Sequence, residues 1–334
     1  MIEDRYITLA HGNGGRFMRE LIDEVFLAAF ADAPPDADCD AAPLPGAQGD
    51  LMITIDGFTV QPIEFPGGDL GALAAHGTIN DLAVAGAEVR WLALGAILEE
   101  GFEIACLRRV VASFAGAARA AGARVVTGDT KVVPRGQGGG AYFTVTGIGV
   151  RVRDALAMSR IVAGDAVLVS GPVGDHGIAV MLARQDFDMR GDVRSDCASV
   201  LPLCRALWPL PGLRFMRDPT RGGLATVAHE IVAATGLGLR LREAALPVRP
   251  ATTSVCEMLG YDPLYLACEG RAVAVVAAEQ ADAALASWRA LEDGQDAALI
   301  GHLGAGAPAV VLATRIGGER YLDELDDDPL PRIC

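Results

Sequence analysis

Hydrophobic and polar positions along the chain fall into short apolar runs and longer stretches with helical spacing. Short apolar runs bounded by glycine, proline or polar residues predict strands. In the first half of the sequence these runs are residues 51–55, 58–60, 90–98, 124–127 and 142–150. Apolar side chains that recur every three or four residues predict helices over residues 16–30, 69–85 and 102–121. The second helix has Asp69 as its expected N-cap, and the third is expected to end at Gly122.

The second half of the sequence continues the alternation of strands and helices. Residues 166–170 predict a strand that runs into the glycine-rich segment 171–177 and then a helix. Residues 217–223 form a turn that opens a helix over residues 224–235, and the alternation ends near residue 314. The pattern predicts an α+β protein with two domains. We expect an N-terminal glycine loop and helix (1–40), an N-terminal sheet domain (41–153), a C-terminal α/β domain (154–316) and a flexible tail (317–334).

The net charge limits the classes of binding partner, and the pattern of cysteines indicates the cellular compartment. The formal charge is −15 with no offsetting stripe of lysine or arginine, which argues against nucleic acid. An anionic substrate such as a nucleotide would then need metal ions to balance its charge. The seven cysteines are scattered, with no Cys-x-x-Cys pair, as expected of reduced cytosolic thiols. The N-terminus lacks the features of a signal peptide and no apolar run could cross a bilayer, so we expect a soluble cytoplasmic protein.

Three aspartates and a lysine in the first domain are candidates for phosphate chemistry. Asp56 and Asp129 are predicted at the ends of apolar strands, and Asp81 lies beside Asn80 on the second predicted helix. Carboxylate oxygens hold Mg²⁺ that is bound to substrate phosphates. Lys131 would place an ammonium on a phosphate or a developing charge. Taken singly, such aspartates are more often turn formers and caps, so both interpretations stay open at the level of spacing.

A glycine-rich loop at residues 11–15 stands in front of the first predicted helix. Backbone N–H groups at such a place can approach a phosphate, although most loops of this kind are simply turns. The loop is not a Walker loop, because no G-x-x-x-x-G-K-[ST] occurs in the chain. The glycine-rich segments together with the aspartates favour a nucleotide site over a set of unrelated turns.

The sequence ends on Cys334, behind prolines and a run of acids. Five acids and no base lie between Tyr321 and Asp328, and Pro329 and Pro331 oppose a helix, so this segment is expected to be solvated and extended. A thiol on such a tether can visit sites that a core cysteine cannot reach. The alternative is an incidental thiol at a frayed terminus.

Seven segments, in order along the whole chain, resemble one family. They are residues 54–58, 65–69, 76–83, 127–133, 170–177, 218–225 and the terminal Pro331-Arg332-Ile333-Cys334. This set resembles the HypE family of carbamoyl dehydratases, which act in [NiFe]-hydrogenase maturation and belong to the superfamily of aminoimidazole ribonucleotide synthetase. One departure is Gly57, where the family usually has serine after the aspartate.

The resemblance implies a two-domain PurM-like fold and a homodimer whose N-terminal domains pair through their sheets, with ATP and Mg²⁺ bound. It also implies that a carbamoyltransferase partner, HypF, loads a carbamoyl group onto Cys334. ATP-dependent dehydration of this thiocarbamate would give an S-cyanate, and the cyanide would pass to iron held by a HypC–HypD complex.

The residues and the resemblance together give a set of candidate site residues. Cys334, Lys131 and Glu269 are the catalytic candidates, with Glu269 as the base that removes the amide protons. For Glu269 the alternative is a surface acid, and His176 and His11 are weaker candidates for the base. The candidate ATP ligands are Gly12, Gly14, Gly15, Asp56, Asn80, Asp81, Thr127, Gly128, Asp129, Asp218, Arg221 and Gly222. The candidate metal ligands among them are Asp56, Asp81 and Asp129.

Two other functions fit parts of the sequence. A small-molecule kinase of the same superfamily would use the aspartates and glycines but has no need of the terminal cysteine. A non-catalytic carrier would use the cysteine but has no need of the aspartates and Lys131. The carbamoyl dehydratase is the function that uses both.

Overall fold

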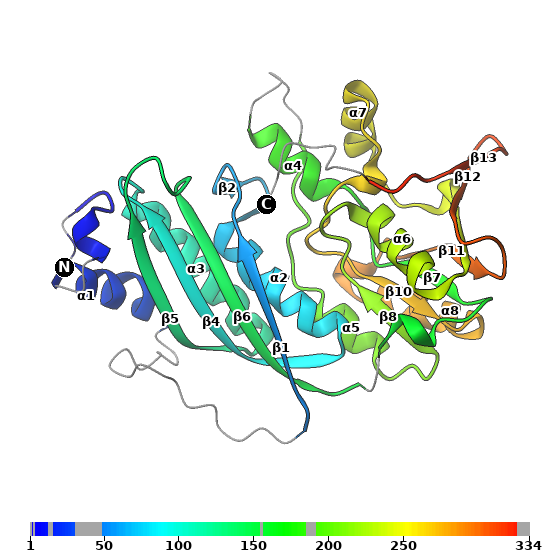
Figure 1. The fold of residues 1–334 in the computed structure, drawn as a ribbon, viewed down its shortest axis with the longest axis horizontal. Helices are drawn as coiled ribbons and strands as arrows, with labels where there is room; N and C mark the ends of the chain where they lie inside the picture. The colour runs from blue at the N-terminus through cyan, green and yellow to red at the C-terminus, as the bar shows by residue number, and fades with distance from the viewer. Residues whose placement is uncertain are drawn as a thin grey trace. The chain divides into compact units, whose positions relative to one another are not determined.

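The computed structural model describes residues 2, 4–12, 16–30, 49–153, 156–184 and 192–325. The chain divides into two compact units (Figure 1). The first contains the residues up to 82 together with 87–152, and the second contains residues 83–86 together with the described residues from 153 on. Each unit is built around its own sheet, which confirms the predicted α+β class.

The first unit is a four-stranded sheet with helices on one face. Its strands lie in the order β1 (Leu51–Phe58), β6 (Ala141–Arg151), β4 (Ala87–Glu99) and β5 (Arg124–Val133). β4 and β5 are parallel, and the other neighbours are antiparallel. Figure 1 shows α2 (Leu70–Val84) and α3 (Ile104–Ala121) lying across one face of this sheet. The shorter elements are η1 (Leu9–Gly12), α1 (Arg16–Leu21), the π-helical η2 (Ile22–Leu27), β2 (Glu64–Phe65) and β3 (Gly68–Asp69).

The N-cap of α2 and the end of α3 lie where the sequence predicts. Asp69 Oδ1 accepts hydrogen bonds from the backbone N–H groups of Gly71 (2.8 Å) and Ala72 (2.9 Å), which confirms Asp69 as the N-cap of α2. A cap of this kind contributes about 1 kcal/mol. α3 ends at Gly122, whose φ of 77° is the left-handed conformation that favours glycine.

The two faces of this sheet differ in character. Directly paired residues on neighbouring strands point to the same face, and together they form a row across the sheet. The row that contains Asp56 continues through Val145 and Leu94. Val145 and Leu94 are 0% and 3% exposed, so this row points to the face that the helices cover. The neighbouring row points the opposite way, to a face that carries exposed apolar side chains from β1. Leu51, Ile53 and Ile55 are 57%, 71% and 67% exposed on that face, which we call the open face.

Two of the strands contain an aspartate that the sequence placed after the end of the strand. Asp56 and Asp129 were expected to follow their strands, but this expectation is wrong. Asp56 pairs with Val145 inside β1, and Asp129 pairs with Gly95 inside β5. Both are edge strands, where a charged side chain is tolerated because one flank of the strand is open to water.

The second unit contains a seven-stranded mixed sheet. Its strand order is β13 (Glu319–Tyr321), β12 (Val310–Ala313), β9 (Gly238–Arg242), β11 (Ala298–Gly304), β7 (Ala166–Val169), β10 (Val273–Val276) and β8 (Leu213–Arg217). The α-helices are α4 (Asp175–Ala183), α5 (Leu201–Leu207), α6 (Gly223–Thr235), α7 (Pro250–Leu259) and α8 (Ala281–Arg289). Short helical turns are η3 (Met158–Arg160), η4 (Glu243–Ala245), η5 (Pro263–Tyr265), η6 (Ala278–Gln280) and η7 (Glu292–Gly294).

The core of the second unit lies around its central strands. Every residue of β7 and β10 is buried, as the continuous apolar runs in their sequences predict. α6 packs on this sheet through Leu224, Val227 and Ile231, spaced three and four apart. Among the described residues, no helix is long and apolar enough to cross a membrane.

Candidate functional site

Two of the three predicted metal ligands belong to one local arrangement, in which α2 packs on β1. Thr54 Oγ1 donates a hydrogen bond to Asp81 Oδ2 at 2.9 Å, joining the strand to the helix. Thr54 and Asp56 are two residues apart in β1, so both side chains point to the face that α2 covers. The fold therefore brings Asp56 and Asp81 to the same side of β1 within one chain.

Glycines allow this close approach of helix and strand. A Cβ on Gly77 of α2 would lie 2.7 Å from Cε1 of Phe58. A Cβ on Gly147 of β6 would lie 2.7 Å from Cγ2 of Thr78. Because real Cβ atoms are not found at such distances, larger residues at either place would push α2, and Asp81 with it, away from the sheet.

The same helix supplies Asn80 and His76, which lie one turn apart. Asn80 is 1% exposed. His76 is largely buried, and its Nδ1 atom has no hydrogen-bond partner among the described residues. Burial lowers the pKa of His76 from 6.5 to about 4, so the ring is neutral near pH 7.

Asp129 and Lys131 lie elsewhere in the first unit. The row through Asp129 contains Gly95, Thr144 and Gly57, so Asp129 points to the open face, away from α2. Lys131 follows two residues later on the same face, and both residues are exposed. β5 and β1 are opposite edges of the sheet. A single chain therefore does not bring Asp129 and Lys131 together with Asp56 and Asp81.

The glycine neighbours of these residues have different surroundings. A Cβ on Gly128 would lie 2.6 Å from the carbonyl oxygen of Leu94, so a side chain there would collide with β4. A Cβ on Gly57 would meet nothing within 4 Å, so serine would fit where this chain has glycine. Thr127 is half-buried at the start of the same segment of β5.

The donors at this site fit a metal ion that is held mainly by phosphate. Among the described residues, no group of three or more His, Cys, Asp or Glu side chains could hold a metal by itself. Asp56 and Asp81 offer hard carboxylate oxygens, which suit Mg²⁺. Mg²⁺ commonly uses one or two carboxylates together with substrate phosphates, so the pair fits that mode of binding and not an all-protein cage.

The N-terminal glycine loop is described only in part. Gly12 closes η1 against β5, and a Cβ there would lie 2.8 Å from Cβ of Val132, so Gly12 has a packing role. His11 is buried, and its Nδ1 accepts a hydrogen bond from the backbone N–H of Thr8 at 3.0 Å. Gly14 and Gly15 lie outside the described residues, as does Cys334.

In the second unit, Glu269 lies at a buried position. It is 6% exposed, so the alternative of a surface acid is wrong. Its backbone N–H donates to Asp196 Oδ1 at 3.0 Å, and Asp196 Oδ2 lies 3.4 Å from Nε of Arg271. A side chain on Gly270 would collide with the carbonyl oxygen of Asp196, so glycine is needed beside Glu269. The apolar residues 264–268 before Glu269 form the end of the helical turn η5 followed by irregular chain, and not a strand.

Asp196 and Arg271 are the residues that sequence reasoning missed. Burial raises the pKa of Asp196, and the Arg271 guanidinium opposes that shift. Arg271 also donates from Nε to the carbonyl oxygen of Pro172 at 3.1 Å. The pair thus fixes the backbone on both sides of Glu269. An arginine directly before the apolar run 272–277 is the signal in the sequence that something buried must pair with it.

The turn that opens α6 lies against the Glu269 segment. Gly222, with φ 68°, is the left-handed residue before the helix, and a Cβ on Gly223 would lie 2.5 Å from the carbonyl oxygen of Leu266. The backbone N–H of Cys268 donates to the carbonyl oxygen of Pro219 at 3.0 Å. The predicted ligands Asp218, Arg221 and Gly222 therefore lie on a turn that contacts the residue before Glu269.

His176 is part of the supporting structure of this unit. It is 0% exposed, and its Nδ1 atom lies 2.8 Å from Ser195 Oγ. Burial lowers its pKa to about 3, so it is a poor proton acceptor at neutral pH. Its neighbour Asp175 accepts a hydrogen bond from Thr252 Oγ1 at 2.6 Å and pairs with Arg249 at 3.2 Å. These contacts favour Glu269 over His176 as the candidate base.

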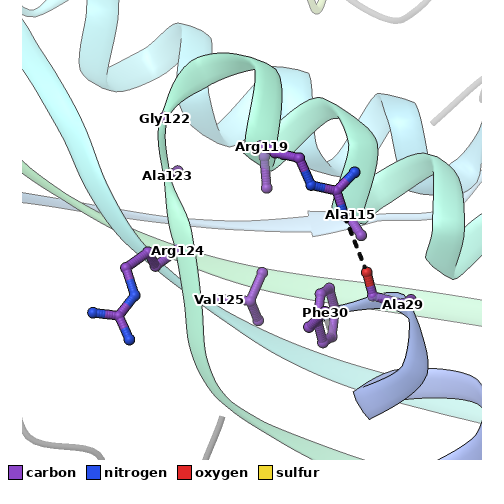
Figure 2. Close-up of a pocket in the computed structure, with 9 residues that line it drawn as sticks. Ala29, Phe30, Ala115, Arg119, Gly122, Ala123, Arg124 and Val125 are labelled. Atoms are coloured by element: carbon purple, nitrogen blue, oxygen red, sulfur yellow. Dashed lines mark hydrogen bonds between the residues drawn. The ribbon is translucent and has the colours of Figure 1, made fainter. Parts of the chain in front are cut away.

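A cavity in the first unit does not involve any predicted site residue. Its volume is about 230 Å³, and it lies where Ala29 and Phe30 meet the end of α3 and the start of β5 (Figure 2). Figure 2 shows Arg119 of α3 directed at the carbonyl oxygen of Ala29, to which its Nη2 donates at 3.4 Å. The other lining residues are Phe30, Ala115, Ala118, Gly122, Ala123, Arg124 and Val125, with no carboxylate among them. The lining offers no ligand for a metal-bound phosphate.

The buried state of His76 predicts a pH-dependent stability. An unfolded chain takes up a proton at this side chain below pH 6.5, whereas the folded chain resists protonation down to about pH 4. The contribution of His76 to the free energy of unfolding is therefore fully present above pH 6.5. It falls as the pH drops toward 4, by about 1.4 kcal/mol per pH unit. Urea unfolding should show a smaller loss between pH 7.5 and pH 5 in His76→Gln than in the wild type. The exposed His302 is the matched control, since His302→Gln should keep the wild-type loss; equal losses in all three proteins would contradict the prediction.

Comparison with known proteins identifies the family. Residues 38–151 match the AIR synthase related protein N-terminal domain, and residues 162–312 match its C-terminal domain. The carbamoyl dehydratase HypE of Rhodobacter capsulatus is 47% identical over 343 residues, covering 100% of this chain and 99% of that protein. A crystal structure of the hydrogenase maturation protein HypE in complex with ATP is 44% identical, with a TM-score of 0.92 and coverage of 98% and 99%. A crystal structure of a HypE–HypF complex is 38% identical, with a TM-score of 0.80 and coverage of 93% and 100%. The chain therefore belongs to the HypE family of carbamoyl dehydratases.

Proposed function

We propose that this chain uses ATP to dehydrate an S-carbamoyl group on its own Cys334 to an S-cyanate. The observation that carries the proposal is the terminal Pro331–Cys334 segment in a chain of this family. Four of the five described cysteines are poor acceptors by comparison, because a thiolate is the reactive form. Burial raises the pKa of Cys106 and Cys256 to about 11 and raises those of Cys204 and Cys268 further.

The reaction balances in two steps. In the first, the amide oxygen of the thiocarbamate attacks the γ-phosphorus of ATP, ADP leaves and one N–H proton is lost. In the second, the C–O bond breaks, phosphate leaves and the second N–H proton is lost as the C≡N bond forms. Phosphorylation converts a poor leaving group into a good one, so the protein must mainly position the reactants and neutralise charge.

The first unit supplies the groups suited to the phosphates. Mg²⁺ bound with ATP would neutralise the phosphate charge in a chain whose net charge is −15. Asp56 and Asp81 would hold that ion from the β1 side of the site. Lys131 would stabilise the charge that develops on the transferred phosphoryl group.

A second copy of the chain would bring Asp129 and Lys131 to the same site. The open face carries Ile53 and Ile55 at 71% and 67% exposure, which is unusual for a strand in contact with water. Packing this face against its equivalent in a homodimer would bury these side chains. Such an isologous pairing would also let Asp129 and Lys131 of one chain approach the edge of the other chain that holds Asp56. The proposed site is thus shared between two chains.

Two partners complete the proposed pathway of the carbamoyl group. A crystal structure of a related HypE with HypF supports HypF as the protein that loads Cys334. A HypC–HypD complex that carries iron would accept the cyanide. Both transfers require the sulfur of Cys334 to reach a partner as well as the chain's own ATP site.

Glu269 is the proposed base for the N–H protons. Its carboxylate can accept a proton and is held by a rigid, buried segment, whereas glutamine keeps the size but cannot accept one. Glu269→Gln should therefore slow dehydration by roughly 100-fold or more, while ATP binding and carbamoyl loading remain. The rate is measured by mass spectrometry on preloaded protein. Glu257→Gln is the matched control on exposed α7, and a normal rate in Glu269→Gln would remove this role.

The intact mass of the purified protein tests the function. The protein is incubated with carbamoyl phosphate, the HypF partner and Mg·ATP. We expect a carbamoyl adduct on Cys334 that loses the mass of one water only when ATP is present. ATP hydrolysis without any adduct would instead favour a kinase of the same superfamily that acts on a free small molecule.

A further inference from the structure

The chain segment that leads to Cys334 is fastened to the second unit before the described residues end. β13 ends at Tyr321, and Leu322 is 2% exposed in the core. The carbonyl oxygen of Leu322 accepts a hydrogen bond from Nε2 of His229 at 2.9 Å. The carbonyl oxygen of the next residue, Asp323, accepts a hydrogen bond from the hydroxyl of Tyr265 at 2.7 Å.

The last described residue of this segment contacts the turn that opens α6. Cδ1 of Leu325 lies 3.2 Å from the place that a Cβ on Gly222 would occupy. His229 and Gly222 belong to α6 and its start, and Tyr265 lies on η5, which packs on α6. One helix and its neighbour therefore hold residues 322–325 in place, although Asp323 and Glu324 are exposed.

These contacts are more than the fold of the sheet requires. Leu322 is the only one of residues 322–325 whose side chain is buried in the core. Its backbone N–H already donates to the carbonyl oxygen of Val310 at 2.9 Å. The hydroxyl of Tyr265 reaches an exposed residue beyond the last strand. Their common effect is to fix where the tail leaves the unit, next to the turn with the candidate ligands Asp218 and Arg221.

We propose that His229 and Tyr265 are positioning residues that set the starting point and the free length of the Cys334 tether. The inference rests on the proposed function, in which the sulfur of Cys334 must reach the γ-phosphate. With both hydrogen bonds made, nine residues of sequence, 326–334, follow the anchored segment, and nine residues span at most about 32 Å. With both lost, Leu322 still holds the chain through its packing and its bond to Val310, so the tether has the twelve residues 323–334, a length of sequence that spans at most about 43 Å.

A longer tether lowers the local concentration of the thiocarbamate at the ATP site. The effective concentration falls roughly as the −3/2 power of tether length, so release of the anchor predicts a loss of roughly 1.5-fold from length alone. Binding of ATP does not involve the tether and is expected to stay unchanged.

The test compares single-turnover dehydration in variants of the full-length protein preloaded with carbamoyl on Cys334. His229→Leu with Tyr265→Phe removes both hydrogen bonds, and His229→Gln keeps a side-chain N–H donor and should restore most of the rate. Tyr261→Phe is the matched control, because it removes a tyrosine hydroxyl that makes no hydrogen bond to the described tail residues 322–325. We expect the double variant to dehydrate at about two-thirds of the wild-type rate or less, with unchanged ATP affinity and an unchanged melting temperature of the ATP-bound protein.

A second variant separates tether length from folding. Insertion of four glycine and serine residues after Leu325 leaves both anchors intact and lengthens the free tether to about thirteen residues, so it should lower the rate by a similar factor. Wild-type rates in the double variant and the insertion would overturn the proposal, as would a loss of rate that is matched by a loss of ATP affinity. If the wild-type protein forms no adduct on Cys334, it is the proposed function that fails.

Discussion

Replacing Cys334 by alanine is expected to abolish cyanate formation completely, while folding and ATP binding remain. The carbamoyl group must be carried by a nucleophilic sulfur, and alanine offers no atom that can form the thiocarbamate. Cys334 comes nine positions after the anchored segment 322–325 in the sequence, and the described core residues of the two units hold their packing without it. Its loss should therefore leave the melting temperature and the ATP affinity at wild-type values. Intact mass after incubation with carbamoyl phosphate, HypF and Mg·ATP should show unmodified protein.

Cys106 offers the matched control for this experiment. It is half-buried beside Glu64, and burial raises its pKa to about 11, so little of it is thiolate at neutral pH. Cys106→Ala should therefore load and dehydrate like the wild type. Cyanate formation that survives in Cys334→Ala would mean that a different sulfur carries the group, and the tether interpretation would then be wrong.

The sequence was a good guide to local structure. Asp69 and Gly122 mark the ends of helices because capping depends on a few neighbouring residues, and those are visible in one segment of sequence. The continuous apolar runs of β7 and β10 likewise report burial on both faces. The resemblance of seven short segments pointed to the family that the comparisons then showed.

Features that depend on partners far along the chain could not be predicted in the same way. The face to which Asp56 or Asp129 points depends on the pairing of β1 with β6 and of β5 with β4, which no single segment encodes. The contact of Asp196 with the Glu269 segment joins residues 73 positions apart. The same holds for His229 and Leu322, which are 93 positions apart, so the anchor of the tail was not visible in the sequence.

Chains that carry different substitutions are expected to complement each other if the site is shared. Asp56→Asn and Asp129→Asn should each reduce dehydration by roughly 100-fold or more as homodimers, because each damages both sites of the dimer. A heterodimer of the two contains one site with both substitutions and one site with neither. It should therefore recover about half of the wild-type rate per dimer. The heterodimer is purified with two different affinity tags after co-expression, and its rate is measured on preloaded protein.

The structure supplies a pair of substitutions that should fail to complement. Asp56 and Asp81 lie on the same side of β1 in one chain. Asp81 accepts a hydrogen bond from Thr54, which is two residues before Asp56 in that strand. A heterodimer of Asp56→Asn with Asp81→Asn therefore has one damaged carboxylate in each site and should stay as slow as either homodimer. Recovery with Asp129→Asn but not with Asp81→Asn can arise only when opposite edges of two sheets meet in one site. If neither heterodimer recovers, Asp129 acts within its own chain, and because it points away from α2 there, it cannot share a metal ion with Asp56 and Asp81.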